Sequence, residues 1–225
     1  MIQPEHQRRA YLDALGIDVW LPRDQADPEP DVSDATIASG DMDWDTLRAT
    51  IAACTRCPLH QSRTQTVFGV GSADPDWMII GEAPGAEEDR RGEPFVGRSG
   101  KLLDEMLRAI GQSRDSVFIA NILKCRPPNN RDPEPEESAE CRGYLERQIE
   151  LLRPKIILAV GRIAAHLLLD TDTPVGQLRG SVHKLGNTPL VVTYHPAYLL
   201  RSPSQKRKAW DDLCLAERVM LEASA

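Results

Sequence analysis

The chain contains 225 residues, enough for one sizeable hydrophobic core with a short appendage. Its formal net charge of −7 belongs to residues 1–48, with 11 acidic and 4 basic side chains; residues 49–225 hold 23 of each, so charge neither predicts nor excludes a nucleic-acid partner. The sequence has no 18-residue apolar run and no basic-then-apolar N-terminus, which argues against a membrane span and a signal peptide, so we expect a cytoplasmic protein.

The first 43 residues are predicted to form an extension. Residues 1–20 have the apolar spacing of a short helix, and residues 22–41 are rich in Pro, Asp and Ser, a composition typical of a flexible acidic linker. A further helix is expected to begin near Asp43, because DWDTLRATIAAC places three apolar side chains on one face. We therefore divide the chain into an extension over 1–43, either simply solvated or protein-binding, and a main domain over 44–225.

Four short apolar runs alternate with helical patterns in the main domain. The runs are WMII (77–80), VFIA (117–120), KIILAV (155–160) and PLVVTY (189–194). The helical patterns cover residues 100–110, 135–152, 162–169 and 204–222. Short runs without polar interruption are typical of strands buried on both faces. The alternation predicts an α/β protein, a three-layer α/β/α sandwich with a central four-stranded parallel sheet.

Polar or glycine-rich sequence follows each predicted strand. In chain order these stretches are GEAPG, NILKCRPP, GR and HPAYLLR. The carboxyl ends of parallel strands meet at one edge, where open α/β sheets bind ligands. We therefore expect Glu82, Asn121 and His195 to converge on one crevice, although a histidine before proline can also be a structural turn residue.

Several side chains near this crevice suit a flat, polar ligand such as a nucleobase. Phe95 lies in a long polar loop, where its ring either stacks on a base or anchors the loop in the core. Asn121 offers one acceptor and two donors, which can pair with a base edge or cap a turn. Tyr198 and Leu199, followed by Arg201, combine an apolar wedge with a basic flank, as in DNA-binding loops, but they also suit the first turn of a helix.

Four cysteines have a spacing that suits a metal centre. Cys54 and Cys57 form a C-x-x-C pair, Cys125 follows after 67 residues, and Cys141 follows after 15 more. The odd total of five cysteines and the expected reducing compartment argue against a disulfide framework. Four thiolates can bind zinc or a [4Fe–4S] cluster, and buried cysteines with an incidental pair are the remaining alternative.

Taken together, the motifs GEAPGAEED, PFVG, NILKCRPPNNR, LRG and YHPAYLLR, with the cysteine spacing, resemble those of the family-4 uracil-DNA glycosylases. The resemblance covers about residues 44–220. This family consists of bacterial and archaeal repair enzymes, and the resemblance implies an enzyme that flips uracil out of single- or double-stranded DNA. Hydrolysis of the N-glycosidic bond would then leave an abasic site. It also implies that the four cysteines bind a [4Fe–4S] cluster rather than zinc. We expect a bacterial protein that is associated with the nucleoid when it acts, and a monomer, which is the default for an enzyme that clamps DNA.

The resemblance assigns roles to individual residues. Phe95 would stack on the flipped uracil, Asn121 would read its polar edge, and His195 would donate a hydrogen bond to its O2 atom. Glu82 would act on the sugar side, where water attacks. The backbone of residues 83–86 would line the sugar side with it, and the expected substrate-binding residues of this motif are Gly81, Ala83, Pro84 and Gly85. Tyr198, Leu199 and Arg201 are expected to contact the DNA.

Two departures from related proteins shape the expected chemistry. The best-known superfamily members carry an Asp where this chain has Ala83, so Glu82 is the expected water-activating residue. A related branch that traps DNA covalently carries Lys-Arg-Arg-Ile-His after the second strand, where this chain reads PPNNRDPEPEE, so we expect no covalent adduct. The alternatives are a DNA-binding module of this fold without catalysis and a zinc-dependent interaction protein.

Overall fold

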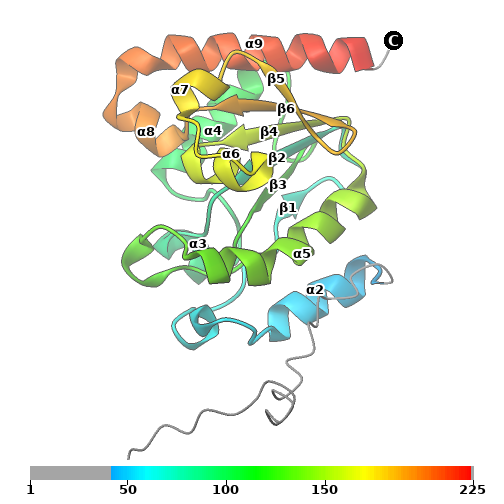
Figure 1. The fold of residues 1–225 in the computed structure, drawn as a ribbon, viewed down its shortest axis with the longest axis vertical. Helices are drawn as coiled ribbons and strands as arrows, with labels where there is room; N and C mark the ends of the chain where they lie inside the picture. The colour runs from blue at the N-terminus through cyan, green and yellow to red at the C-terminus, as the bar shows by residue number, and fades with distance from the viewer. Residues whose placement is uncertain (1–41, 224–225) are drawn as a thin grey trace, which may run out of the picture. The chain divides into compact units, whose positions relative to one another are not determined.

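The computed structural model describes residues 42–223, whose fold is shown in Figure 1. The helix predicted over 1–20 and the linker predicted over 22–41 lie outside the described residues. Within 42–223, no helix is both long and apolar enough to cross a membrane.

A six-stranded sheet with the strand order β1-β3-β2-β4-β6-β5 forms the centre of the fold. The strands are β1 Val70–Gly71, β2 Trp77–Gly81, β3 Phe118–Asn121, β4 Ile156–Val160, β5 Val182–Leu185 and β6 Thr188–Thr193. The four inner strands run parallel, and β1 and β5 pair antiparallel at the edges. The sheet thus has six strands where four were predicted, because β1 has only two residues and β5 alternates exposed and half-buried side chains.

Helices cover both faces of this sheet. They are α2 Trp44–Ala53, α3 Ala86–Arg91, α4 Arg98–Ala109, α5 Pro135–Leu152, α6 Arg162–Leu169, α7 Val175–Leu178, α8 Pro196–Arg201 and α9 Lys206–Ala223, with the 3-10 turns η3 Pro58–Gln61, η4 Pro128–Asn130 and η5 Pro203–Gln205. The five helices predicted from periodicity correspond to α2, α4, α5, α6 and α9. The remaining three have four to six residues, too few for a periodic pattern.

Local sequence signals explain where two of the helices begin. Asp43 precedes α2, and its carboxylate accepts a hydrogen bond from the Thr46 backbone N–H at 2.8 Å. Helix α5 starts with Pro135, and Glu134 and Glu137 form a capping box around it. These contacts satisfy N–H groups that the first helical turn leaves without partners.

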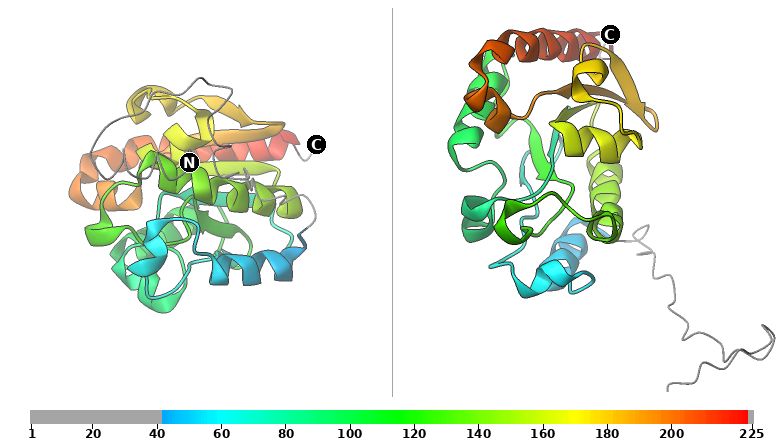
Figure 2. Two further views of the ribbon diagram at one scale, coloured as in Figure 1. Left: turned by 60° about the horizontal axis from the view of Figure 1, so that its bottom comes forward. Right: turned by 60° about the vertical axis from the view of Figure 1, so that its left-hand side comes forward.

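Successive residues of a strand point to opposite faces, so each face of the sheet has its own core. On one face, Met78 and Ile80 of β2 pack with residues of α2, α5 and α6. On the other face, Trp77 and Ile79 pack with residues of α4 and α9. Figures 1 and 2 show the sheet between α9 on one side and α5 with α2 on the other. The domain therefore has three layers, and the parallel strands all end at one edge.

Candidate active site and cysteine pocket

A cleft of about 760 Å³ lies where the parallel strands end. Glu82 directly follows β2, Asn121 is the last residue of β3, and His195 lies just beyond β6; all three line the cleft. The structure therefore brings together the three residues expected from the strand ends. The volume is within the range of small-molecule sites, and the lining combines aromatic rings with a few polar groups, as such sites do.

Phe95 lines the cleft in an uncommon backbone conformation. Its φ of 54° lies in the left-handed region, which costs a bulky residue about 1–3 kcal/mol. The Arg114 guanidinium stabilises this turn by donating to the carbonyls of Pro94 and Phe95 at 2.7 and 3.2 Å, and it pairs with Asp104 at 3.1 Å. Gly100 packs so closely that a Cβ there would lie 1.7 Å from the Phe95 carbonyl oxygen. These contacts fix the ring at the cleft wall.

Gly81 makes room for two cleft side chains without lining the cleft itself. A Cβ at this position would lie 2.4 Å from Asn121 Oδ1 and 2.6 Å from Phe95 Cζ, well inside van der Waals contact. Glycine therefore allows these two side chains to meet over the end of β2. Of the other residues predicted in this motif, Ala83 and Gly85 line the cleft, whereas Pro84 is buried outside it.

His195 is a neutral imidazole with its ring proton on Nε2. Its Nδ1 accepts a hydrogen bond from the Ala197 backbone N–H at 3.1 Å, which assigns the proton of the neutral ring to the other nitrogen. Burial, and secondarily the charge of Arg201, lower the pKa of His195 to about 4. The ring stacks on Phe95, with 5.5 Å between centroids and 28° between planes. At neutral pH the cleft thus holds an uncharged N–H donor beside an aromatic face.

Glu82 lies in the cleft in surroundings that favour its neutral form. Burial raises the pKa of Glu82 to about 7, helped by the charge of Asp132 and opposed by that of Arg162. Asp132 and Arg162 line the same cleft and form an ion pair at 2.6 Å. A carboxyl group that titrates near neutral pH suits general acid–base catalysis. Neither Asp132 nor Arg162 was predicted from the sequence as a site residue, because nothing in the neighbouring residues marks the pair.

Helix α8 carries the three residues predicted to contact DNA. Tyr198, which is 36% exposed, and Arg201 both line the cleft. Leu199 is 1% exposed and packs in the core shared with α4 and α9, which is at odds with the predicted contact. The reason is that neighbouring residues of a helix point in different directions. Leu199 therefore faces inward, and Leu200, 37% exposed, faces outward.

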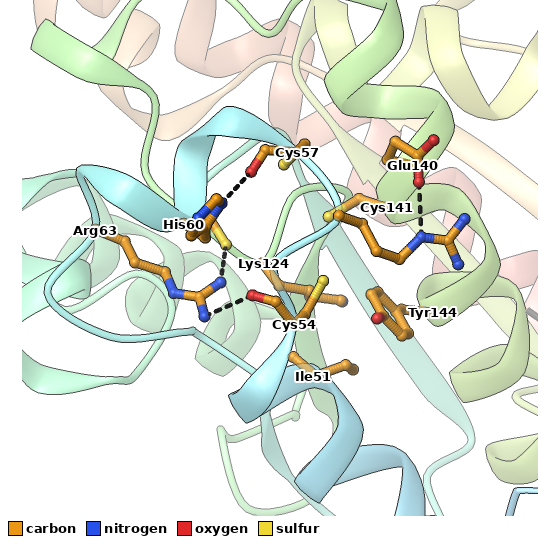
Figure 3. Close-up of a pocket in the computed structure, with 11 residues that line it drawn as sticks. Ile51, Cys54, Cys57, His60, Arg63, Lys124, Glu140, Cys141 and Tyr144 are labelled. Carbon is orange, nitrogen blue, oxygen red and sulfur yellow. Dashed lines mark hydrogen bonds and ion pairs between the residues drawn. The ribbon is translucent and has the colours of Figure 1, made fainter. Parts of the chain in front are cut away.

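The four predicted metal-binding cysteines line a second pocket. Cys54 follows α2, Cys57 precedes η3, Cys125 lies beyond β3, and Cys141 lies on α5. Figure 3 shows the side chains of Cys54, Cys57 and Cys141 pointing toward a common space. Arg63 donates to Cys125 Sγ at 2.9 Å and to the Cys54 carbonyl at 2.8 Å. A cation beside a cysteine sulfur favours the thiolate, which is the form that binds metal.

The four cysteines form an all-sulfur donor set within one pocket. Burial raises the pKa of Cys57, Cys125 and Cys141, the last to about 12, so these thiols ionise only when a positive centre compensates them. Among residues 42–223, no three His, Cys, Asp or Glu side chains form a group suited to a single metal ion. The four thiols therefore fit an all-cysteine centre, either zinc or a [4Fe–4S] cluster.

A buried carboxylate on α9 supports the segment that leads to His195. Asp212 is fully buried and binds Arg179 at 2.8 Å. It also accepts hydrogen bonds from Thr193 Oγ1 at 3.0 Å and from the Gly180 backbone N–H at 3.1 Å. These bonds join α9 to the last residue of β6, two positions before His195, and to the LRG segment.

Comparisons with known proteins point to one superfamily. A family model described as the uracil DNA glycosylase superfamily matches residues 68–214. The chain is 44% identical over 170 residues to a type-4 uracil-DNA glycosylase of Archaeoglobus fulgidus, covering 72% of this chain and 85% of the relative. A type-4 enzyme of Thermotoga maritima is 46% identical over 158 residues, with 69% and 82% covered. One of Pyrobaculum aerophilum is 42% identical over 182 residues, with 77% and 93% covered.

Proposed function

The chain belongs to the uracil-DNA glycosylase superfamily, and on this basis we propose that it excises uracil from DNA by hydrolysing the N-glycosidic bond, leaving an abasic site. One observation supports this most directly, the presence of Phe95, Asn121, His195 and Glu82 in a single cleft. They supply a stacking ring, an amide edge, an uncharged donor and a carboxyl group. The substrate is uracil in single- or double-stranded DNA.

Phe95 and Asn121 recognise the base. Stacking on an aromatic ring contributes about 1–3 kcal/mol per base and does not depend on its identity. Selectivity comes from Asn121, whose amide can donate to a uracil carbonyl and accept from the ring N–H. Cytosine presents an amino group and an unprotonated ring nitrogen along the same edge. Because Asn121 is 2% exposed, the mispaired donors and acceptors could not form hydrogen bonds with water instead. The free-energy cost of these unsatisfied groups excludes cytosine.

His195 stabilises the leaving group. Breaking the N-glycosidic bond leaves negative charge on uracil, much of it at O2. The neutral imidazole of His195 donates its Nε2–H to this oxygen, with Nδ1 already held by the Ala197 N–H. A donor that is in place before the charge develops needs no reorganisation, and removing one such donor typically costs about 100- to 1000-fold in rate.

Glu82 acts on the opposite side of the broken bond. Positive charge develops on the sugar as the base leaves, and a water molecule attacks C1′. The ionised carboxylate of Glu82 stabilises this charge and accepts a proton from the water, while the hydroxyl oxygen bonds to the sugar and the uracil anion leaves with the bonding electrons. The reaction therefore needs Glu82 ionised and His195 neutral.

Tyr198 and Arg201 contact the DNA strand at the mouth of the cleft. The target nucleotide must leave the base stack before it can enter, and unstacking costs a few kcal/mol in a duplex. A U·G mismatch is easier to open than a normal pair, so it should be the better duplex substrate. The exposed Tyr198 ring and the Arg201 cation suit an opened strand and its phosphates.

The four cysteines hold a [4Fe–4S] cluster with a structural role in this proposal. Their positions mean that a cluster would tie the end of α2 to the segment after β3 and to α5. Base excision is a hydrolysis and needs no electron transfer. The enzyme acts as a monomer on DNA in the bacterial cytoplasm, with residues 1–43 as an extension outside the glycosylase domain.

A gel assay tests this function. The purified protein, without added metal, is incubated with a labelled oligonucleotide containing one uracil, either single-stranded or opposite G or A, and abasic sites are then cleaved with alkali. We expect alkali-dependent cleavage at uracil and none at cytosine in the matched oligonucleotide. If a folded, coloured preparation cleaves none of the substrates, uracil excision is refuted, and the fold then serves other damaged bases or binds DNA without catalysis.

A further inference from the structure

Lys124 is a buried lysine whose side chain has two defined partners. It is 1% exposed, and its Nζ donates to the Asn121 carbonyl at 2.8 Å and to Gln148 Oε1 at 2.6 Å. Lysine is among the residues least often fully buried, because its amine loses water on burial. Lys124 lies in the bend that follows β3, the strand that ends in Asn121.

Hydrogen bonds around Lys124 connect this bend to three other parts of the fold. Gln148 of α5 is fully buried and donates its Nε2 to the Phe68 carbonyl at 2.9 Å. The neighbouring Val67 N–H donates to the Lys124 carbonyl at 2.8 Å. Within the bend, the N–H groups of residues 122 and 123 donate to the carbonyls of Gly81 and Glu82 at 3.0 and 3.1 Å. The bend is thus held by α5, by the segment before β1 and by the end of β2.

Lys124 also belongs to the wall of the cysteine pocket, as Figure 3 shows. Residues at the two ends of the same bend, Asn121 and Cys125, line the cleft and the cysteine pocket respectively. One buried side chain therefore connects the residue that reads the base with the wall of the pocket that the cysteines line.

We propose that Lys124 is a positioning residue for Asn121, which holds the amide in register with uracil by fixing its main chain against α5 and the cysteine pocket. The proposal rests on the proposed function. Its physical basis is the tight fit at Asn121, whose Oδ1 leaves no room for even a Cβ at position 81. A main-chain shift of a fraction of an ångström would therefore misalign the amide.

A double-mutant cycle tests this role. Lys124→Met removes every Nζ donor and keeps the length of the side chain. In the parent background, we expect kcat/KM for uracil excision to fall about 100-fold, and calorimetric affinity for free uracil to fall with it. In an Asn121→Ala background no amide remains to be positioned, so the same substitution should change both quantities within about 2-fold. Iron per chain, visible absorption and melting temperature are measured for every variant.

Lys155→Met is the matched control, because Lys155 is an exposed lysine that pairs with Asp76 at 2.9 Å. It should leave both quantities unchanged. A loss of equal size in the two Asn121 backgrounds would show that Lys124 serves the fold alone, and Lys124→Met with parent activity would also refute the proposal. If Lys124→Met fails to fold or to bind iron, Gln148→Met enters the same cycle. It removes the anchor on α5, and we expect about a 10-fold loss only where Asn121 is present.

The cycle separates two kinds of failure. A parent protein that neither releases nor binds uracil refutes the proposed function. An active parent whose substitutions at Lys124 and Asn121 are additive refutes only the positioning role.

Discussion

Replacing Gly81 by alanine should disable uracil excision through a clash that can be sized from the structure. The new Cβ would stand 2.4 Å from Asn121 Oδ1 and 2.6 Å from Phe95 Cζ, whereas ordinary contact begins at 3.4 Å. The two base-binding side chains must therefore retreat by roughly 1 Å. A misplacement of this size costs about 100-fold in rate, equivalent to about 2.7 kcal/mol of transition-state stabilisation.

Single-turnover excision from a uracil-containing oligonucleotide measures the effect, and a melting curve checks the fold, since overpacking itself costs about 1–3 kcal/mol of stability. The matched control is Gly176→Ala in α7. A Cβ there meets only the Tyr194 hydroxyl at 3.9 Å, an ordinary contact, so we expect parent activity. If Gly81→Ala were folded and excised uracil within about 3-fold of the parent, the argument that Asn121 and Phe95 must meet over residue 81 would be wrong.

Three further predictions concern the cleft and the cysteines. The single-turnover rate should rise with pH through about 7, because Glu82 must lose its proton before it can accept one from water. Glu82→Gln should lower the rate about 100-fold or more and make it independent of pH. A parent rate that does not change between pH 6 and 8 would contradict this. His195→Ala should lower the rate about 100- to 1000-fold at every pH above 5, because its pKa of about 4 keeps the ring neutral throughout; a loss that appears only at low pH would show that the charged form is the active one. Cys125→Ala should abolish the visible absorption and lower the melting temperature at the same time. A colourless variant as stable as the parent would rule out a structural cluster.

The strand ends were predictable because parallel topology by itself sets their convergence. Four apolar runs alternating with helices required the residues after them to meet at one edge, and Glu82, Asn121 and His195 do so. The cysteines also meet in one pocket, as their spacing indicated. The first inference depends on a regular alternation of strands and helices, and the second on the type and number of the residues, both of which can be read from the sequence.

The supporting residues could not be predicted, because each forms a hydrogen bond with a distant part of the chain. Arg114 holds a turn 19 positions before it, Arg63 reaches a sulfur 62 positions away, and Lys124 is fixed by α5. Nothing in the neighbouring sequence marks these partners. The inward turn of Leu199 was missed for another reason, since the orientation of α8 is set by packing against α4 rather than by any pattern in its six residues.

The position of the cysteines along the chain also affects how the protein would unfold. Joining Cys57 to Cys125 in one centre closes a loop of 67 intervening residues that contains β2, α3, α4 and β3. By the chain-entropy reasoning used for disulfides, a closure of this length restricts the unfolded chain by about 4 kcal/mol. Oxidative loss of the proposed cluster would remove that restriction, and the loop that it closes carries Glu82, Phe95 and Asn121. Oxidation of the iron would then destabilise the part of the protein that carries these three residues, although none of the residues that bind uracil had itself been altered.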